Sequence, residues 1–407
     1  WSGGSRLGGR ARQGCGARAC RVDGCSRHGR RSASLLRKTA KCGLSDIGIL
    51  SKWRRGSSRR HFDNLSVLEG VVAVRPLGIL MAYADLPVDA LRVYRPTLSV
   101  PTDLDEFWAM TLAETRVHDL AARFDPVDSG LATVQTFDVA FAGFEGSTVR
   151  GWLHVPVGTT GRLPAVVEYV GYGGGRGLPH ERVLWADAGY AHLVMDSRGQ
   201  GSSWSVGDTA DEGASGGPSH PGFMTRGILD PLTYYYRRLI TDAVRAIECV
   251  RVHPRVDAAR VAASGKSQGG GLSLAVAALV TDIAAVATDV PFLSDFPRAI
   301  SFVERDPYAE VARYLKAHRD HLGRVLETLA YFDVANLGTR ARSPALFSVG
   351  MMDDVCPPST VYAAFNHYAG PKEMVEYPFN GHEGGEAFHD IVKMRFLSER
   401  LGRRPRH

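Results

Sequence analysis

The segment Gly265-Lys266-Ser267-Gln268-Gly269 carries the G-x-S-x-G pattern of a serine nucleophile. It follows a short apolar run, residues 260–263, and precedes a stretch typical of a helix, from residue 269 onward. A serine on such a strand-to-helix turn needs small neighbours, because a Cβ there would clash with nearby backbone. The turn exposes the Ser267 hydroxyl and directs the backbone N–H of Gln268 toward a developing oxyanion. The pattern predicts nucleophilic catalysis by Ser267.

A serine nucleophile needs a general base and a carboxylate that orients the base, in the chain order Ser, Asp or Glu, His. His382 lies between the last predicted strand and the final predicted helix, so it is our candidate base. Asp353 and Asp354 follow the preceding predicted strand. We take Asp353 as the orienting carboxylate, with Asp354 as the alternative, since spacing does not separate neighbours. His367 and His389 lie within helical patterns, where an ordinary surface or core histidine is expected.

A glycine-rich loop follows the apolar run 165–170 and extends to Gly177. In folds with this type of nucleophile, the second oxyanion donor comes from the loop after an earlier strand. The backbone N–H of Tyr172 is our candidate for that donor. A glycine-rich turn without a catalytic role is the alternative.

Patterns for nucleotide or metal binding are incomplete. A P-loop ending at Ser267 would need glycine at position 260, which is Arg260, and a dinucleotide fingerprint in the glycine-rich loop would need glycine in place of Arg176. His318 and His321 could ligate a metal, but a solvated helix face explains them better without a further ligand nearby. We therefore predict a site with no metal and no organic cofactor.

Residues 81–407 alternate short apolar runs with helical stretches, which indicates a mostly parallel sheet covered by helices on both faces. The candidate site residues lie at the carboxyl ends of the strands, where the functional sites of such sheets are found. An early helix is expected over 103–118, with Thr102 as its N-cap, and a β-hairpin over 133–144 and 149–157. Further strands are expected at 165–170, 191–195, 261–263, 284–287, 345–349 and 374–377, and helices at 181–188, 232–252, 272–280, 359–368 and 386–401.

Two segments interrupt this alternation. Residues 202–230 are rich in Gly, Ser and Asp, and residues 292–343 form a mostly helical insertion. Both could overhang the site, or be a surface loop and a helical cap without a catalytic part. No apolar stretch is long enough to predict a transmembrane helix.

The chain has 407 residues and a net charge of +6, but this charge is concentrated near its start. Residues 1–80 carry a net charge of +13 and residues 81–407 a net charge of −7. The first segment is rich in Gly, Ser and Arg, holds four of the six cysteines, and has little apolar periodicity, so we expect disorder. The first methionine is Met81. We interpret residues 1–80 as translated upstream sequence or a misplaced start; a transit peptide, a secretory signal and a zinc knuckle fit less well.

Residues 81 to about 402 resemble the acetyl xylan esterase / cephalosporin-C deacetylase family, carbohydrate esterase family seven. The Arg-Gly-Gln, Gly-x-Ser-Gln-Gly and His-Glu motifs together are that family's signature. Matching segments include Asp105-Glu-Phe-Trp108, Gly171-Tyr-Gly-Gly-Gly-Arg-Gly177, Asp196-Ser-Arg-Gly-Gln-Gly201, Ser267-Gln-Gly-Gly270, Asp289-Val-Pro-Phe292 and His382-Glu-Gly-Gly385.

The resemblance implies an α/β-hydrolase fold for residues 81–407 and a Ser267–His382–Asp353 triad, with Asp353 preferred over Asp354. It implies the Tyr172 and Gln268 amides as the oxyanion hole. It further implies substrate-binding or supporting roles for Arg198, Gln200, Pro291 and Glu383. Many family members have a small residue where this chain has Lys266, and the effect of that cation stays open.

By resemblance, the substrates are small acetylated sugars such as xylo-oligosaccharides, and cephalosporin C. The enzyme would be a cytoplasmic homohexamer without a membrane or nucleic-acid partner for residues 81–407; only two separated cysteines there also fit a reducing compartment. Two other function classes stay open. One is a different hydrolase of this fold, such as a peptidase. The other is a nucleic-acid binder acting through the basic residues 1–80.

Overall fold

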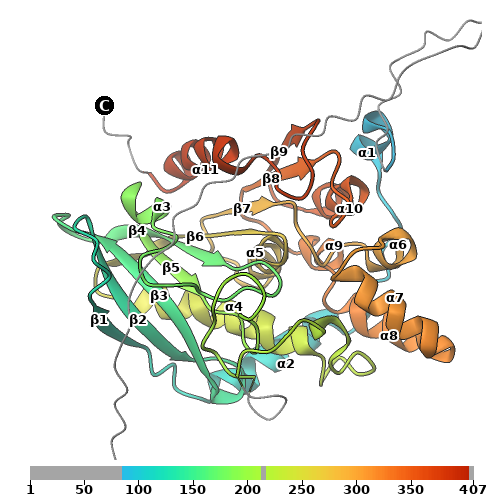
Figure 1. The fold of residues 1–407 in the computed structure, drawn as a ribbon, viewed down its shortest axis with the longest axis horizontal. Helices are drawn as coiled ribbons and strands as arrows, with labels where there is room; N and C mark the ends of the chain where they lie inside the picture. Colours follow the sequence, from blue (N-terminus) through green and yellow to red (C-terminus); the bar gives the residue numbers. More distant parts are fainter. Residues whose placement is uncertain (1–84, 212–216, 403–407) are drawn as a thin grey trace, which may run out of the picture. The chain divides into compact units, whose positions relative to one another are not determined.

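The structure is a computed structural model that describes residues 85–211 and 217–402. The expectations for residues 1–80 lie outside the described residues. The described part contains a nine-stranded sheet with helices on both faces (Figure 1). Its strands are β1 (Arg123–Val127), β2 (Val134–Ala142), β3 (Thr148–Pro156), β4 (Leu163–Tyr169), β5 (Ala191–Met195), β6 (Val256–Lys266), β7 (Ala285–Asp289), β8 (Ala345–Gly350) and β9 (Lys372–Tyr377).

The helices connect these strands or form the insertion between β7 and β8. The α-helices are α1 (Val88–Val93), α2 (Leu104–Arg116), α3 (Leu184–Asp187), α4 (Tyr235–Val252), α5 (Gln268–Leu279), α6 (Phe296–Phe302), α7 (Tyr308–Ala317), α8 (Leu322–Ala330), α9 (Val334–Gly338), α10 (Pro358–His367) and α11 (Glu386–Arg400). Three short 3-10 turns are η1 (Phe144–Gly146), η2 (Phe223–Thr225) and η3 (Arg319–His321).

The sheet order is β1-β2-β3-β5-β4-β6-β7-β8-β9. Strands β1, β2, β3 and β5 pair antiparallel, and the pairs from β5 through β4 to β9 are parallel. The β2–β3 pair is the predicted hairpin, which turns through η1. The predicted mostly parallel sheet is confirmed, and its strand ends bring the loops after β4, β6, β7, β8 and β9 to one edge.

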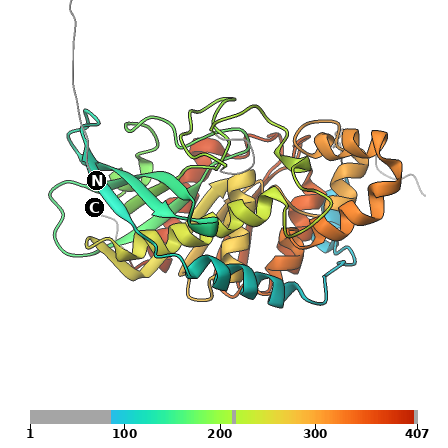
Figure 2. The same ribbon diagram turned by 90° about the horizontal axis from the view of Figure 1, so that it is seen from below.

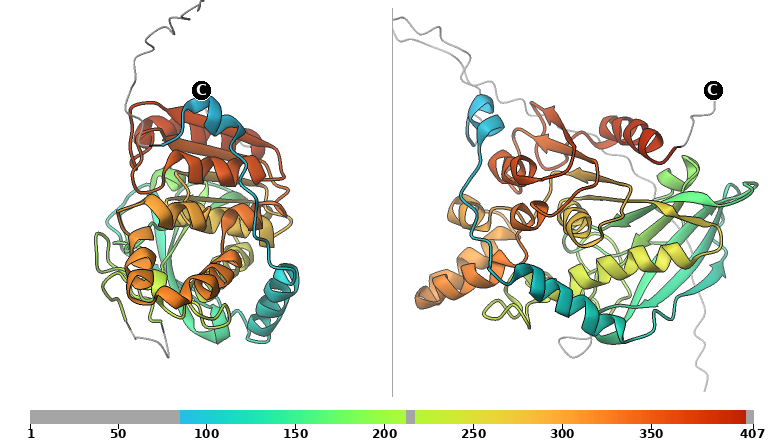
Figure 3. Two further views of the ribbon diagram at one scale, coloured as in Figure 1. Left: turned by 90° about the vertical axis from the view of Figure 1, so that its right-hand side faces the viewer. Right: turned by 180° about the vertical axis from the view of Figure 1, so that it is seen from behind.

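Alternate residues of the parallel strands enter two separate cores. On one face, Val167 and Ala263 pack with residues of α4, α5 and α10; on the other, Val166 and Ala262 pack with residues of α3 and α11. Figure 1 shows α3 and α11 on one side of the sheet and α4 and α2 on the other. Burial on both faces explains why these strands read as continuous apolar runs. Figures 2 and 3 show the insertion α6–α8 at the opposite end of the described residues from strands β1 and β2.

Several predicted element bounds were wrong. Helix α2 begins at Leu104 with Asp103 as its N-cap, so Thr102 does not cap it. The helix predicted at 181–188 is only the four-residue α3, which ends before Gly189 at a φ of 87°. Helix α1 and edge strand β1 were not predicted, because both are short and β1 is mostly exposed, so neither has an apolar pattern.

Helix α5 begins at Gln268, one residue before the start at 269 expected from the serine turn and four before the predicted helical run 272–280. Three glycines in its first turn have low intrinsic helix propensity. Their place is explained by close packing: a Cβ on Gly269 would lie 2.0 Å from the carbonyl oxygen of Tyr169, and one on Gly271 would lie 2.4 Å from that of Phe292. The helix therefore starts directly at the turn that carries Ser267, because only glycine allows this approach to the strand-end loops.

None of the helices described is long and apolar enough to cross a membrane.

A buried polar cluster lies on the α3 side of the sheet. His192 Nε2 lies 3.0 Å from Glu168 Oε2, and Arg182 donates to Glu168 Oε1 at 2.8 Å. His154 Nδ1 lies 3.1 Å from Thr136 Oγ1. Burial, followed by the charge of neighbouring His192, lowers the pKa of His154 from 6.5 to about 3. His154 is therefore neutral in the folded protein at neutral and mildly acidic pH.

This lowered pKa predicts acid destabilisation. Below pH 6.5 the unfolded chain takes up a proton at His154, whereas the folded chain takes it up only near pH 3, so stability falls as the pH drops through this window. Protonation of His154 in the unfolded chain should lower the free energy of unfolding by about 2 kcal/mol between pH 7.5 and 5.0. Replacing His154 with glutamine should remove this contribution. Urea denaturation at the two pH values measures it. The exposed His318→Gln variant is the control, and an unchanged pH dependence in His154→Gln would contradict the prediction.

Candidate active site

Ser267 occupies a strained turn between β6 and α5. Its φ is 58° and its ψ is −119°, a conformation that costs a non-glycine residue about 1–3 kcal/mol. The turn is held by a hydrogen bond from Ser267 N to the carbonyl oxygen of Asp289 (2.9 Å) and by Phe292 N donating to the Ser267 carbonyl (3.0 Å). A Cβ on Gly265 would lie 2.3 Å from backbone of Gly269. The predicted requirement for flanking glycines is confirmed, and Ser267 keeps 8% exposure.

The structure brings His382 against Asp353 and away from Asp354. His382 Nδ1 lies 2.9 Å from Asp353 Oδ2, and Asp353 is 1% exposed. The other oxygen, Asp353 Oδ1, accepts hydrogen bonds from the backbone N–H groups of Val355 and Cys356, each at 2.8 Å. Asp354 instead forms an exposed ion pair with Arg305. This contact favours the tautomer with the proton on Nδ1, donated to Asp353, which leaves Nε2 with a lone pair.

The loop that carries His382 packs directly on the end of β8. Met352 N donates to the Asn380 carbonyl at 2.9 Å, and a Cβ on Gly350 would lie 2.1 Å from the carbonyl oxygen of Gly381. This close backbone contact places the loop that carries Asp353 next to the loop that carries His382. Within the described residues no hydrogen bond joins Ser267 to His382, as is common for unliganded sites.

Glu383 braces the same loop. Its carboxylate accepts hydrogen bonds from Gly381 N and from Asn380 Nδ2, both at 3.0 Å. Its own backbone N–H first, then the Asn380 amide, keep the pKa of Glu383 below its usual value, and the charge of Lys266 acts in the same direction. Glu383 therefore stays ionised while it holds the loop, and half-buried Lys266 lies within electrostatic range of it.

The two candidate oxyanion donors lie on adjacent backbone segments. Gly171 of the glycine-rich loop lies next to the Ser267 turn: a Cβ there would lie 3.7 Å from the Lys266 carbonyl oxygen. Among the described residues, neither Tyr172 N nor Gln268 N donates to another protein group. Both amides are therefore available to a ligand beside Ser267, which is what an oxyanion hole requires.

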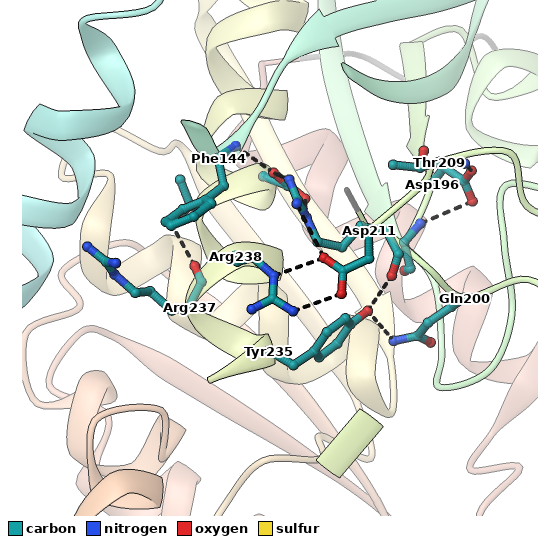
Figure 4. Close-up of polar contacts among 12 residues, drawn as sticks. Phe144, Asp196, Gln200, Thr209, Asp211, Tyr235, Arg237 and Arg238 are labelled. Carbon is teal, nitrogen blue, oxygen red and sulfur yellow. Dashed lines mark hydrogen bonds and ion pairs between the residues drawn. The ribbon is translucent and has the colours of Figure 1, made fainter. Parts of the chain in front are cut away.

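Gln200 ties these two segments together. Its Oε1 accepts a hydrogen bond from Gly173 N at 2.7 Å, and its Nε2 donates to Gln268 Oε1 at 2.9 Å. Its Nε2 also donates to the hydroxyl of Tyr235 at 2.9 Å, a contact drawn in Figure 4. Because one side chain bonds both loops, Gln200 supports the relative position of the two amides.

Arg198 is almost fully buried, at 1% exposure, in an ion network. Its guanidinium donates to both oxygens of Asp242, at 2.5 and 2.8 Å, and lies 3.5 Å from Asp211. Asp211 is also held by Arg238, as Figure 4 shows. The Arg198 carbonyl accepts the Tyr235 hydroxyl at 2.6 Å. Arg198 thus supports the loop that carries Gln200 and contacts no residue of the candidate triad.

Pro291 is buried in the loop after β7, next to Phe292. A Cβ on Gly270 would lie 3.2 Å from Pro291 Cα, so the loop packs tightly on the start of α5. The structure therefore gives Pro291 a packing contact beside the Ser267 turn.

The sequence analysis missed several contributors. Tyr236 donates to Gln268 Oε1 at 3.0 Å, and the hydroxyl of Tyr172 donates to Glu310 of α7 at 2.7 Å. The half-buried Tyr172 ring also packs edge-on against Phe223 and Phe292. Helix α7 of the insertion therefore contacts the glycine-rich loop, so the insertion is more than a detached cap. No local pattern signals contacts between residues this far apart in the chain.

His389, expected to be an ordinary helix histidine, is buried at the far side of the Ser267 turn. His389 and Lys393 of α11 contact the carboxylate of Asp289 at 3.1 and 2.6 Å. The backbone carbonyl of Asp289 is the acceptor for Ser267 N. This network anchors α11, which directly follows the His382 loop, to the strand beside the nucleophile.

Among the described residues, neither the large cavity nor a cluster of metal ligands contributes to the candidate site. A cavity of about 940 Å³ lies between residues 96–110 and helix α8, and none of Ser267, Asp353 and His382 lines it. Among the described residues no group of three or more His, Cys, Asp or Glu side chains is arranged to hold a metal ion.

The chain is similar to known acetyl esterases over most of its length. The family model described as Acetyl xylan esterase (AXE1) matches residues 81–400. The solved acetyl xylan esterase from Paenibacillus sp. R4 is 38% identical, with a TM-score of 0.72, and the match covers 77% of this chain and 100% of that one. Acetyl xylan esterase 1 from Thermoanaerobacterium sp. JW/SL YS485 is 34% identical, with a TM-score of 0.71, covering 77% and 99%. These likenesses confirm the α/β-hydrolase fold.

A curated relative is more distant. Acetyl esterase Axe7A of Xylanibacter ruminicola is 27% identical over 292 residues, which is 71% of this chain. The match spans 65% of the length of that relative.

Proposed function

Because the chain belongs to the acetyl xylan esterase family of carboxylic ester hydrolases, we propose that it is a serine esterase acting through an acetyl-enzyme intermediate. Its proposed substrates are small acetylated sugars, such as acetylated xylo-oligosaccharides, and acetyl esters like that of cephalosporin C. The observation that carries the proposal is the contact of buried Asp353 with His382 at the sheet edge that also bears the strained Ser267 turn.

In the proposed mechanism, His382 Nε2 takes the proton of the Ser267 hydroxyl as its oxygen attacks the acetyl carbonyl carbon. The Tyr172 and Gln268 amides donate to the oxyanion; one such donor is typically worth about 10²–10³ in rate. The ester C–O bond then breaks, and His382 returns the proton to the departing sugar alcohol. Water, deprotonated by His382, attacks the acetyl-enzyme, and acetate leaves as the proton returns to Ser267. Asp353 stabilises the imidazolium in both halves.

By the same resemblance we propose a cytoplasmic homohexamer. Light scattering on the purified full chain tests the assembly: the mass of a hexamer supports it, and the mass of a monomer contradicts it.

The test is acetate release by the purified full chain from acetylated xylo-oligosaccharides and cephalosporin C, with the Ser267→Ala variant as the blank. Release by the wild type alone supports the proposal. A folded wild type that releases no acetate contradicts it, and cleavage of aminoacyl anilides in the same assay would favour the peptidase alternative.

A further inference from the structure

Trp204 is a large aromatic side chain that is both exposed and fixed. The residue is 57% exposed, yet its indole Nε1 donates a 2.8 Å hydrogen bond to the carbonyl oxygen of Tyr172. Exposed aromatic side chains that keep their polar atom bonded present a flat apolar surface in one orientation. The guanidinium carbon of Arg182 lies 5.5 Å from the centroid of this ring, so a cation borders the exposed indole. The acceptor belongs to the residue whose amide is a candidate oxyanion donor, so the ring lies beside the site.

The ring rests on glycines of the same loop. A Cβ on Gly174 would lie 2.3 Å from the indole Cζ2, and one on Gly171 would lie 3.5 Å from it. The same Cβ on Gly171 would lie 3.7 Å from the carbonyl oxygen of Lys266, the residue before Ser267. The indole and the turn that carries Ser267 therefore both approach Gly171 on the side to which a Cβ would point.

The backbone beneath Trp204 is also held in place. Gly175 N donates to the Ser205 carbonyl at 3.0 Å, and Gly177 N donates to the Val206 carbonyl at 2.9 Å. The loop that bears Trp204 is therefore hydrogen-bonded to the glycine-rich loop directly after the glycines that the ring covers. A rigid support lowers the entropy lost when a ligand stacks on the ring.

From this geometry we propose that Trp204 is a sugar-binding platform at the mouth of the candidate active site. The pyranose ring of an acetylated oligosaccharide stacks its C–H face on the exposed indole while the acetyl ester reaches Ser267. A flat, rigid apolar surface suits the C–H face of a pyranose and adds nothing to recognition of the acetyl group. The inference rests on the proposed function for its substrate class.

The kinetic test compares Trp204→Ala, Trp204→Phe and the wild-type full chain on acetylated xylobiose and on ethyl acetate, which has no ring to stack. We expect Trp204→Ala to raise the KM for acetylated xylobiose about 10-fold and to leave the kcat/KM for ethyl acetate within about two-fold. Trp204→Phe should recover most of the sugar affinity. Phe388→Ala, which removes an aromatic side chain that is 82% exposed on α11, is the matched control and should behave as wild type. An equal fall on both substrates would overturn the proposal, because it would indicate only support of the Tyr172 loop.

A binding test separates this inference from the proposed function. Calorimetry measures the affinity of acetylated xylotriose for Ser267→Ala and for the double variant Ser267→Ala/Trp204→Ala. An affinity about 10-fold weaker in the double variant supports the platform even if the wild type releases no acetate. Equal affinities, or no binding by either variant, overturn it.

Discussion

Replacing Ser267 with alanine should lower the kcat for acetyl ester hydrolysis by roughly 10⁶-fold, as loss of a nucleophile does in other serine hydrolases. The loss is large because the hydroxyl oxygen of Ser267 is the proposed nucleophile. No other described hydroxyl occupies the turn between β6 and α5, where we propose that the Tyr172 and Gln268 amides bind the oxyanion. Initial rates of acetate release, with the enzyme raised to micromolar concentration for the variant, measure the change.

The matched control is Ser273→Ala. Ser273 is a buried serine of α5, six residues after Ser267, and its hydroxyl donates only to the Gly269 carbonyl, at 2.8 Å. We expect that variant to keep a kcat within about five-fold of the wild type, since one helix-internal hydrogen bond is worth about 1 kcal/mol. Ser267→Ala protein that retains more than a small fraction of wild-type activity, after repeated purification, would show that Ser267 is not the nucleophile.

Replacing Asp353 with asparagine should reduce kcat at neutral pH by about 10⁴-fold, the loss seen for such a change in other triads. The Asp353 Oδ1 position accepts two backbone N–H groups, those of Val355 and Cys356, so the amide oxygen of asparagine will occupy it. The NH₂ group then faces His382 Nδ1 and donates to it. His382 is forced to carry its proton on Nε2, the nitrogen that must accept the proton of Ser267.

Asp354→Asn is the matched control at the adjacent position. Asp354 is exposed and paired only with exposed Arg305, a contact worth at most about 1 kcal/mol. Its kcat should stay within about two-fold of the wild type. Equal losses in the two variants would contradict the assignment of Asp353, and a large loss in Asp354→Asn alone would reverse it. Thermal denaturation of both proteins checks that each is folded.

The sequence alone predicted the architecture well where burial imposes a pattern. Strands β4, β5, β7 and β8 and the second half of β6 are buried on both faces, so each had to be a short apolar run, and the helices between them followed. Prediction was weaker where packing overrides local preference. Edge strand β1 has no apolar pattern, and the first turn of α5 contains three glycines that local propensity disfavours.

For the site, the residue types and their order along the chain predicted Ser267 and His382, because the strained turn and the late histidine are local features. Spacing could not choose between Asp353 and Asp354. The tertiary structure makes that choice, since only one of two adjacent side chains can point at His382 from the end of β8.

The amino-acid sequence by itself determined the sheet, the serine turn and the residue types available for catalysis, because backbone sterics and apolar periodicity act over a few residues. Only the tertiary structure decided which groups meet. The contact of Lys393 with Asp289, the bridge of Gln200 to Gln268 and the Trp204 indole on the glycine-rich loop all join residues 30 or more positions apart. Such contacts depend on how loops from different strands pack at one edge of the sheet, which no local pattern records.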